Sequence, residues 1–488
     1  MSVKSVPRLV GGEWRLPTGG RTLDVVDPAD TRRVVARIPA MTAPEVTELY
    51  DRAAEASAGW AALSPLDRAA VMGRAARTLR ERHEEIAADL VAEMGKTRAE
   101  AEGEVEKAAD FFDYYAGFAR RPWGELLADG RPGTRTSVRR EPVGVVLLVT
   151  PWNDPLLTPA RKLAPALIAG NTVVLKPATQ TPLVSLHLAR ALHDSGLPAG
   201  VLGVAVGSIR QIEEALLDDV RLDAVSFTGS TPVGRSLQRR LAGRNVRLQT
   251  ELGGKNASAV LADADLDLAV RTIASAAFGQ TGQRCTATSR VVVDRAVAEQ
   301  VVSGLVAQAD ALRVGPGEEK DTVIGPLADP GHRDSVLEHI TRAAAQGAGI
   351  AAGGAAPEGE EYAHGCYVRP TVLVGVDRDM DIWREEVFGP VIAVQVVDGF
   401  DAAVEAVNDS VYGLSSAVFT RDLRQAEAFS DRVRTGQVSV NLPTMGWDVH
   451  MPFGGFGDSG SPFKEQGSEA LNFYTRVKTV AVRYDTGA

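Results

Sequence analysis

The stretch VGVVLLVTPW at residues 143–152 decides the fold class. Its apolar residues follow one another without the alternation of a half-exposed strand, so we expect a β-strand that is buried on both faces. A second run of this kind, TVVLKP at residues 172–177, comes after a helical pattern over residues 158–169. Buried strands separated by helices predict a parallel sheet with helical layers on both sides.

The same alternation continues along the chain in both directions. Residues 183–196 predict an amphipathic helix that ends at Gly196, and VLGVAVG, RQIEEALLD, AVSFTGS and TPVGRSLQRRLA then alternate between strand and helix. A second α/β series begins after Leu252, and residues 43–118 have a helical pattern throughout. The tail NFYTRVKTVAVRY alternates like an edge strand that invites pairing with another chain. We therefore predict an α/β protein with more than one domain.

Composition excludes several classes of function. The chain has 488 residues, with 53 Lys and Arg against 63 Asp and Glu, and its net charge of −10 argues against nonspecific binding to nucleic acid. The longest apolar run is about half of the roughly 20 residues that a membrane span needs, and the N-terminus lacks the pattern of a signal peptide. Two distant cysteines make no disulfide framework. We expect a cytoplasmic protein that binds no membrane and no nucleic acid.

Parallel sheets bind ligands at the carboxyl ends of their strands, and two features of the sequence fall there. Lys176 ends a predicted strand, and Gly229 and Ser230 lie where a strand gives way to a helix, whose first N–H groups can hold a pyrophosphate. The G-x-G-x-x-G fingerprint of many dinucleotide sites does not follow the first strand. By themselves these residues also fit an ordinary strand-to-helix turn.

Cys285 lies in FGQTGQRCTATSR, residues 278–290, among polar neighbours that are unusual for a structural thiol. Three further stretches accompany it, namely TPWNDP (150–155), QTELGGKN (249–256) and EEVFGPV (385–391). In order and spacing these motifs resemble the aldehyde dehydrogenase superfamily, and the resemblance covers nearly the whole chain. Its implied fold has a Rossmann-like parallel-sheet cofactor domain, a second α/β catalytic domain and a small β element for oligomerisation.

The resemblance implies a catalytic role for four residues. Cys285 matches the nucleophile, whose thiolate adds to an aldehyde so that the carbon can release hydride to a nicotinamide. Asn153 and the backbone N–H of Cys285 match the donors to the resulting oxyanion. Glu251 matches the general base that activates water against the thioester, and burial would raise its pKa toward the working range. Lys162 matches a supporting position near the site.

For the cofactor, the resemblance assigns nine residues and no metal site. Lys176 and Thr179 match positions at the adenine ribose, Gly229 and Ser230 the pyrophosphate, and Glu386 the nicotinamide ribose. The remaining positions that line the cofactor cleft are Thr150, Trp152, Leu252 and Phe388. Many relatives have a glutamate where this chain has Thr179 in KPAT. Because a threonine does not repel a 2′-phosphate, we expect NADP to be accepted and preferred over NAD, although Thr179 also fits an NAD enzyme.

The substrate prediction depends on the ending NLPTMGWDVHMPFGGFGDSGSPFKEQG, residues 441–467. This ending looks like the branch that oxidises 2-oxoglutaric semialdehyde (2,5-dioxopentanoate). Arg161 and Arg284 map near the substrate tunnel, as does Phe453, and arginine forks suit carboxylates or phosphonates. Arg161 also fits a salt bridge in the tunnel wall. Asp154 opposes an anionic substrate unless it pairs with one of these arginines, and it also fits a substrate with a hydroxyl or amine.

Other outcomes of the same chemistry stay open at this point. A biosynthetic aldehyde, such as a phosphonate or aromatic aldehyde, fits the motifs, as does acyl transfer to coenzyme A or a noncatalytic member of the fold. Glu251 favours hydrolysis.

The implied domains are residues 1–121 with 142–253 for the dinucleotide, residues 254–456 for catalysis, and residues 122–141 with 457–488 for oligomerisation. A homodimer or homotetramer follows from the last element.

Overall fold

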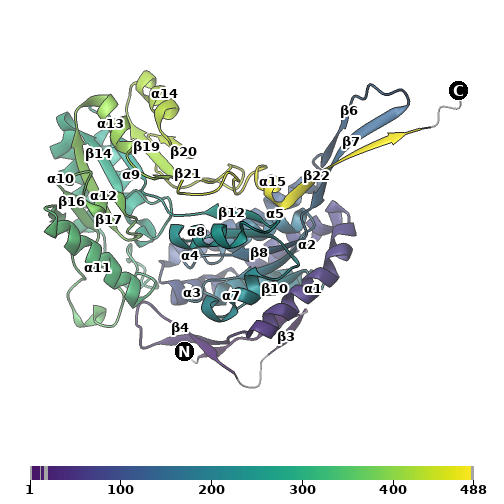
Figure 1. The fold of residues 1–488 in the computed structure, drawn as a ribbon. Coiled ribbons are helices and arrows are strands. Elements are labelled where there is room, and N and C mark those ends of the chain that lie inside the picture. Colours follow the sequence, from purple (N-terminus) through teal and green to yellow (C-terminus); the bar gives the residue numbers. More distant parts are fainter. Residues whose placement is uncertain (1–2, 11, 16–19, 485–488) are drawn as a thin grey trace.

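The computed structural model describes residues 3–10, 12–15 and 20–484, and its first large sheet is the predicted parallel one (Figure 1). Five strands lie in the order β10-β9-β8-β11-β12, and all four pairings are parallel. The strands are β8 (Val145–Val149), β9 (Thr172–Lys176), β10 (Leu202–Val204), β11 (Leu222–Thr228) and β12 (Arg247–Glu251). The prediction from 143–152 is confirmed.

Side chains from successive residues of β8 enter two different cores. Val146 and Leu148 belong to one cluster of buried residues, whereas Val145 and Leu147 belong to another. Helices cover both faces, which explains why the strands have no polar side. The first face carries α2 (Pro65–Glu81), α3 (His83–Met94), α4 (Arg98–Ala116), α5 (Leu157–Ile168) and α6 (Leu183–Asp194), and the second carries α1 (Ala43–Ala62), α7 (Ile209–Leu217) and α8 (Thr231–Leu241).

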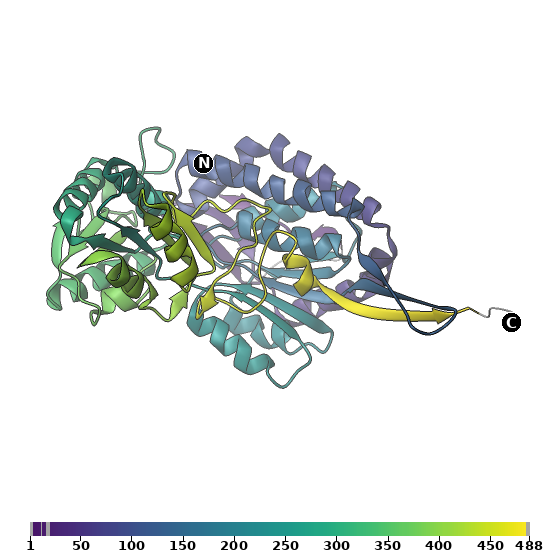
Figure 2. The same ribbon diagram turned by 90° about the horizontal axis from the view of Figure 1, so that it is seen from above.

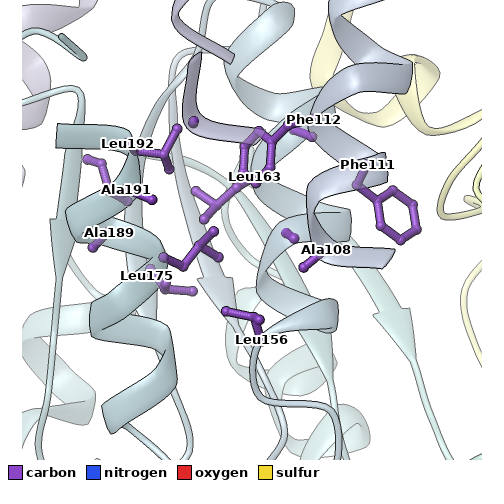
Figure 3. Packing of buried hydrophobic residues seen from close by; sticks show 14 of the residues in the cluster. Ala108, Phe111, Phe112, Leu156, Leu163, Leu175, Ala189, Ala191 and Leu192 are labelled. Atoms are coloured by element: carbon purple, nitrogen blue, oxygen red, sulfur yellow. The ribbon is translucent and has the colours of Figure 1, made fainter. Parts of the chain in front are cut away.

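Figure 3 shows how tightly the first face is filled. Leu163 of α5 and Leu175 of β9 lie between α4 and α6, and neither side chain has any exposed surface. Full burial of one leucine stabilises the fold by about 1.5–3 kcal/mol relative to an exposed one. This packing holds the end of β8 and the start of α5 in place, and the loop between them contains Asn153 and Asp154.

The second large sheet has seven strands in the order β15-β16-β17-β14-β13-β19-β20. All its pairings are parallel except that of the edge strand β15 with β16. Its strands are β13 (Ala257–Val260), β14 (Arg290–Asp294), β15 (Gly349–Ala352), β16 (Thr371–Val374), β17 (Val391–Val397), β19 (Ser415–Phe419) and β20 (Gln437–Val440). Its helices are α9 (Leu266–Phe278) and α10 (Ala298–Ala311) on one face, and α11 (Pro330–Ala345), α12 (Asp381–Arg384), α13 (Gly399–Asn408) and α14 (Leu423–Arg432) on the other.

A three-stranded antiparallel arm projects from the first sheet unit (Figures 1 and 2). The central strand β7 (Thr134–Pro142) pairs with β6 (Gly124–Leu127) on one side and with β22 (Thr475–Arg483) on the other. The short helix α15 (Ala470–Tyr474) immediately precedes β22 in the chain. The predicted edge strand at the tail is therefore present. Leu126, Val477 and Val482 are exposed on this arm.

Small elements complete the fold. Near the N-terminus β1 (Lys4–Ser5), β4 (Thr22–Val26) and β5 (Val34–Pro39) form one sheet, and β2 (Arg8–Val10) pairs with β3 (Glu13–Arg15). Strands β18 (Tyr412–Gly413) and β21 (Phe456–Gly457) pair with each other. Short 3-10 turns in the described residues lie elsewhere along the chain, at Gly117–Arg120, Gly279–Gly282, Arg295–Val297 and Glu360–Tyr362. In the part of the chain that the structure describes, no helix has the length and apolarity to cross a membrane.

Candidate active site

The carboxyl ends of the strands in the first sheet bring the predicted residues together. Thr150 follows β8, Lys176 ends β9, Ser230 follows β11 and Glu251 ends β12. Two cavities meet beside them at Cys285. One lies along the strand ends and has a volume of about 230 Å³; we call it the sheet-edge cavity. The other, the tunnel, has a volume of about 300 Å³ and runs along α4 and the loop 445–449.

The side chain of Asn256 holds the loop of Cys285 through two hydrogen bonds. The side-chain amide of Asn256 donates to the backbone carbonyls of Cys285 (2.7 Å) and Ala287 (2.8 Å). Cys285 lines both cavities. Burial is the main cause of a raised pKa of its thiol, and the carboxylates of Glu251 and Asp154 add to it. The thiol therefore needs a nearby base to form the thiolate at neutral pH.

Asn153 lies at the same junction and is buried. Its side-chain nitrogen donates to the backbone carbonyl of Gln283 (2.9 Å) and faces Oδ2 of Asp154 at 3.3 Å. Its own backbone carbonyl accepts from Lys96 (3.0 Å) and Gln280 (2.8 Å). These contacts fix the amide beside Cys285, where a donor to an oxyanion has to be placed in advance.

Glu251 lies in a buried cluster of charges. Its Oε1 has no hydrogen-bond partner among the described residues. Burial and the neighbouring carboxylate of Glu465 raise the pKa of Glu251 well above its usual range. Lys162, also buried, donates to Ser226 (2.7 Å) and to Glu465, so its charge is taken up by Glu465. A free carboxylate oxygen with a raised pKa is the form that a general base requires.

The two predicted substrate arginines differ in their surroundings. Arg161 lies 3.5 Å from Glu465 and stacks over the ring of Phe453, so the alternative of a salt bridge in the tunnel wall is the observed one. Arg284 donates to the side-chain oxygen of Gln280 (2.8 Å) and contacts the sulfur of Met445. Within the described residues, Arg284 makes no salt bridge with a carboxylate. The tunnel therefore presents a guanidinium that interacts with the charge of Asp154 but has no carboxylate within salt-bridge distance among the described residues.

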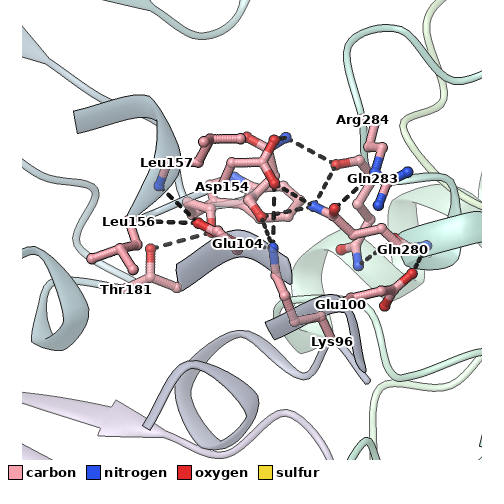
Figure 4. Close-up of polar contacts among 12 residues, drawn as sticks. Lys96, Glu100, Glu104, Asp154, Leu156, Leu157, Thr181, Gln280, Gln283 and Arg284 are labelled. Atoms are coloured by element: carbon pink, nitrogen blue, oxygen red, sulfur yellow. Dashed lines mark hydrogen bonds and ion pairs between the residues drawn. The ribbon is translucent and has the colours of Figure 1, made fainter. Parts of the chain in front are cut away.

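Asp154 pairs with neither arginine but with Lys96, a partner that the sequence reasoning missed (Figure 4). Its Oδ1 lies 3.2 Å from Nζ of Lys96 and accepts from Gln280 at 3.0 Å. Lys96 is itself buried and bonded more closely to Glu104. Asp154 borders both cavities, as Cys285 does, and so lies where the two cavities meet.

In the sheet-edge cavity, Glu386 accepts from the backbone N–H of Gly254 at 2.8 Å. A Cβ at Gly253 would lie 2.1 Å from Oε2 of Glu386, so only glycine lets this carboxylate reach the backbone. Burial raises the pKa of Glu386 to about 7. Trp152, Phe388 and His332 form a cluster of rings in the same wall, with the centroids of Trp152 and Phe388 5.4 Å apart.

The remaining cofactor candidates lie at or near this cavity. Gly229, Ser230 and Leu252 line it, and the hydroxyl of Thr150 is buried without a hydrogen-bond partner among the described residues. Lys176 and Thr179 do not line it; Lys176 donates to the carbonyl of Pro177 at 2.6 Å, and burial lowers the pKa of Lys176 to about 8.

The structure also adds residues that the sequence reasoning did not assign. Glu465 belongs to the EQG run of the C-terminal loop, which pointed to a family branch but not to a contact with Lys162. Gln280 adopts a left-handed backbone conformation, with φ 53°, without the glycine that signals such a turn. His332 lies at the start of α11, far along the chain from its ring partners. Only the tertiary contacts identify these three residues.

The geometry defines a class of protein in which a partly buried cysteine lies between a strand-end cleft and a separate tunnel. The sequence profile of the aldehyde dehydrogenase family matches residues 14–480, and the chain belongs to this family. It is an aldehyde dehydrogenase that uses a nicotinamide cofactor.

Two curated relatives and one solved structure show how close the similarity is. The chain is 43% identical over 476 residues to an alpha-ketoglutarate semialdehyde dehydrogenase of Haloferax volcanii, covering 97% of this chain and 98% of the relative. It is 38% identical to a 2,5-dioxopentanoate dehydrogenase of Saccharolobus solfataricus, with 96% and 97% covered. A betaine aldehyde dehydrogenase of Staphylococcus aureus in complex with NAD+ has a TM-score of 0.95 at 30% identity, with 98% and 95% covered.

Proposed function

We propose that this enzyme oxidises a small aldehyde with a carboxylate at its far end, such as 2,5-dioxopentanoate, to the dicarboxylate. The observation that carries the proposal is Arg284, whose guanidinium makes no salt bridge with any described carboxylate and lines a tunnel that ends at Cys285. An arginine fork binds a carboxylate through two parallel hydrogen bonds. The substrates named for the relatives from Haloferax and Saccharolobus have this form and support the proposal.

In the proposed mechanism Cys285 forms a covalent bond with the aldehyde carbon. The thiol gives its proton to Glu251, and the thiolate sulfur adds to the carbonyl, whose oxygen becomes an oxyanion. The amide of Asn153 and the backbone N–H of Cys285 donate to that oxyanion. The electron pair on the oxygen re-forms the carbonyl as the hydride leaves, and the product on the enzyme is a thioester of Cys285.

Hydrolysis of the thioester is the second half of the proposed reaction. Glu251 first releases to solvent the proton that it took from the thiol. It then removes a proton from water, which attacks the thioester carbon, and the sulfur of Cys285 leaves as thiolate. Glu465 and Lys162 hold opposite charges next to Glu251, and Glu465 raises the pKa of the base. The proton that Glu251 took from water passes to the thiolate of Cys285, which restores the thiol and the free carboxylate.

The sheet-edge cavity fits the nicotinamide half of the cofactor. Its wall combines the carboxylate of Glu386, held by Gly254, with the rings of Trp152 and Phe388, and it opens onto Cys285. Ser230 precedes the first turn of α8 and makes no capping hydrogen bond of its own, which leaves the N–H groups of this turn for a phosphate. When bound, the nicotinamide supplies the acceptor for the hydride.

The preference for NADP remains part of the proposal. Thr179 lies in the loop after β9 and is half-buried, close in sequence to the buried Lys176. A threonine there leaves room for a 2′-phosphate, and Lys176 is the nearest predicted cation. A solved relative binds NAD+, so comparing kcat/KM for NAD and NADP with one aldehyde decides between them.

A panel of purified aldehydes tests the proposed function. Initial rates of NAD(P)H formation are compared for 2,5-dioxopentanoate, succinic semialdehyde, benzaldehyde and a phosphonate aldehyde, with and without coenzyme A. We expect the highest kcat/KM for 2,5-dioxopentanoate and no stimulation by coenzyme A. A higher kcat/KM for benzaldehyde, or a coenzyme A thioester as the product, would contradict the proposal.

We also propose the division into domains at residues 1–121 with 142–253, 254–456, and 122–141 with 457–488. The break between the two large sheets, after β12, and the separate antiparallel arm support these boundaries. The outermost residues, 1–2 and 485–488, lie outside the described part of the chain. The exposed apolar residues of β6 and β22 support a homodimer or homotetramer formed through the arm.

A further inference from the structure

The tunnel has an uneven distribution of charge along its length. Asp154, Arg161 and Cys285 line both the tunnel and the sheet-edge cavity, which places them at the inner end. Arg284 lines only the tunnel. Lys107 lines it as well, with 43% of its side chain exposed, and so marks the outer end.

The negative charge at the inner end is only partly offset by its neighbours, among which Lys96, Arg284 and Arg161 all favour the ionised form of Asp154. Lys96 supplies one ammonium to two carboxylates, Glu104 and Asp154, and its contact with Glu104 is the closer one. The charge of Arg161 faces Glu465. Asp154 therefore keeps part of its negative charge toward Cys285.

Hydrogen bonds fix this carboxylate in place. Gln280 donates to Asp154 through its side-chain nitrogen and accepts from Arg284 through its side-chain oxygen, so it separates the two opposite charges (Figure 4). Burial favours the neutral acid, but the charges of Lys96 and Arg284 outweigh it and hold the pKa of Asp154 below its usual value. Asp154 is thus an ion at neutral pH.

We propose that Asp154 sets the minimum length of the substrate. An aldehyde whose carboxylate lies next to the reacting carbon brings that anion against Asp154, which repels it. A longer chain carries the anion past Gln280 to the unpaired guanidinium of Arg284. This inference rests on the proposed oxidation of an anionic aldehyde. It adds that the enzyme rejects short anionic aldehydes as well as accepting long ones.

The test uses Asp154→Asn in the full-length enzyme, because asparagine keeps the shape and an acceptor for Lys96 and Gln280 but has no charge. The measured quantity is kcat/KM for 2,5-dioxopentanoate divided by kcat/KM for glyoxylate, in which the carboxylate is bonded to the aldehyde carbon. The same ratio for the neutral pair pentanal and acetaldehyde corrects for chain length alone.

We expect the anionic ratio of the wild type to exceed the neutral ratio, and Asp154→Asn to lower the anionic ratio by about tenfold while changing the neutral ratio by less than about twofold. An equal loss for all four aldehydes would indicate a structural role and overturn the inference. Glu100→Gln removes another carboxylate that lines only the tunnel, and it should change the anionic ratio by less than about twofold.

A measurement on the wild type covers the case in which Asp154→Asn does not fold. Glutarate and malonate carry the same charge at different lengths, and each is tested for protection of Cys285 against alkylation by iodoacetamide. We expect glutarate to protect at about tenfold lower concentration than malonate; equal protection overturns the inference. If the wild type does not prefer anionic aldehydes over neutral ones at all, the proposed function itself fails.

Discussion

The sheet-edge cavity and the tunnel share Cys285 but are built by different means. Backbone geometry dominates the first: strand ends, the start of α8, and a glycine that lets Glu386 reach the N–H of Gly254. Side-chain charges from distant segments dominate the second, where Lys96 of the α3–α4 loop contacts Asp154 of the β8–α5 loop. A cofactor common to many enzymes can be held by backbone, whereas a particular substrate needs particular side chains.

Replacing Cys285 by serine should have the largest effect on activity. The proposed covalent bond to the aldehyde carbon forms at its sulfur, where the two cavities meet. We expect kcat to fall by at least about a thousandfold. The matched control is Cys366→Ser, since Cys366 is buried in the core of the second sheet unit and lines neither cavity. Loss of NAD(P)H formation is read by absorbance. Full turnover by the Cys285 variant would contradict the covalent mechanism.

Glu251→Gln should separate the two halves of the reaction. We expect the steady-state rate to fall by about a hundredfold or more, because the general base is lost. Stopped-flow absorbance should still show hydride transfer in a first turnover, slowed because the thiol also loses its proton acceptor. Added hydroxylamine, which cleaves thioesters, should raise the steady-state rate of the variant if thioester hydrolysis has become the slow step. No such increase would contradict the role of Glu251 as the base.

The pH dependence of the wild type follows from the same residue. The raised pKa of Glu251 means that the carboxylate, which is the active form, is present only above that pKa. The rate of thioester hydrolysis should therefore rise with pH and level off once Glu251 has lost its proton. The rate is measured over a span of about pH 6 to pH 10. In Glu251→Gln the rise attributed to this group should vanish.

Arg284→Met tests the tunnel alone. We expect KM for 2,5-dioxopentanoate to rise by about tenfold to a hundredfold, since a charged hydrogen bond contributes about 1.5–3 kcal/mol. KM for benzaldehyde, which has no anion to bind, should change little. Lys107→Met is the control, because Lys107 lines the tunnel but lies near Asp448, at 3.8 Å. Equal increases for both aldehydes would argue against an anion site.

Thr179→Glu should have the smallest effect and concerns the cofactor alone. A carboxylate near the 2′-phosphate should lower kcat/KM for NADP by about tenfold and leave that for NAD within about threefold. Thr179→Gln, of similar size without charge, serves as the control. If the wild type already prefers NAD strongly and Thr179→Glu does not alter the ratio, Thr179 does not select the cofactor.

The sequence allowed most of the fold to be predicted, because each strand of the first sheet is buried on both faces and each helix is amphipathic. The continuous pattern over 43–118 hid the breaks among the four helices α1 to α4, which depend on short capping segments such as Ser64 before Pro65. Cys285, Asn153 and Glu251, which the motifs singled out, all line the sheet-edge cavity, and their roles stay a prediction. The hydrogen-bond partners Lys96 and Gln280 of Asp154, and Glu465 of Lys162, were not predictable from the sequence. No local pattern distinguishes a buried charged or polar side chain from a solvated one.

By itself the sequence determined that hydrophobic runs of strand length alternate with helices, and this periodicity depends only on neighbours along the chain. The motifs identified the family because their order and spacing are written in the chain. Only the tertiary structure decided that Asp154 pairs with Lys96 and that Arg284 makes no salt bridge with a carboxylate in the part of the chain that is described. The physical reason is that the electrostatic effect of a charged side chain depends on the groups around it in space. For Asp154 these groups include Lys96, which is more than fifty residues away along the chain.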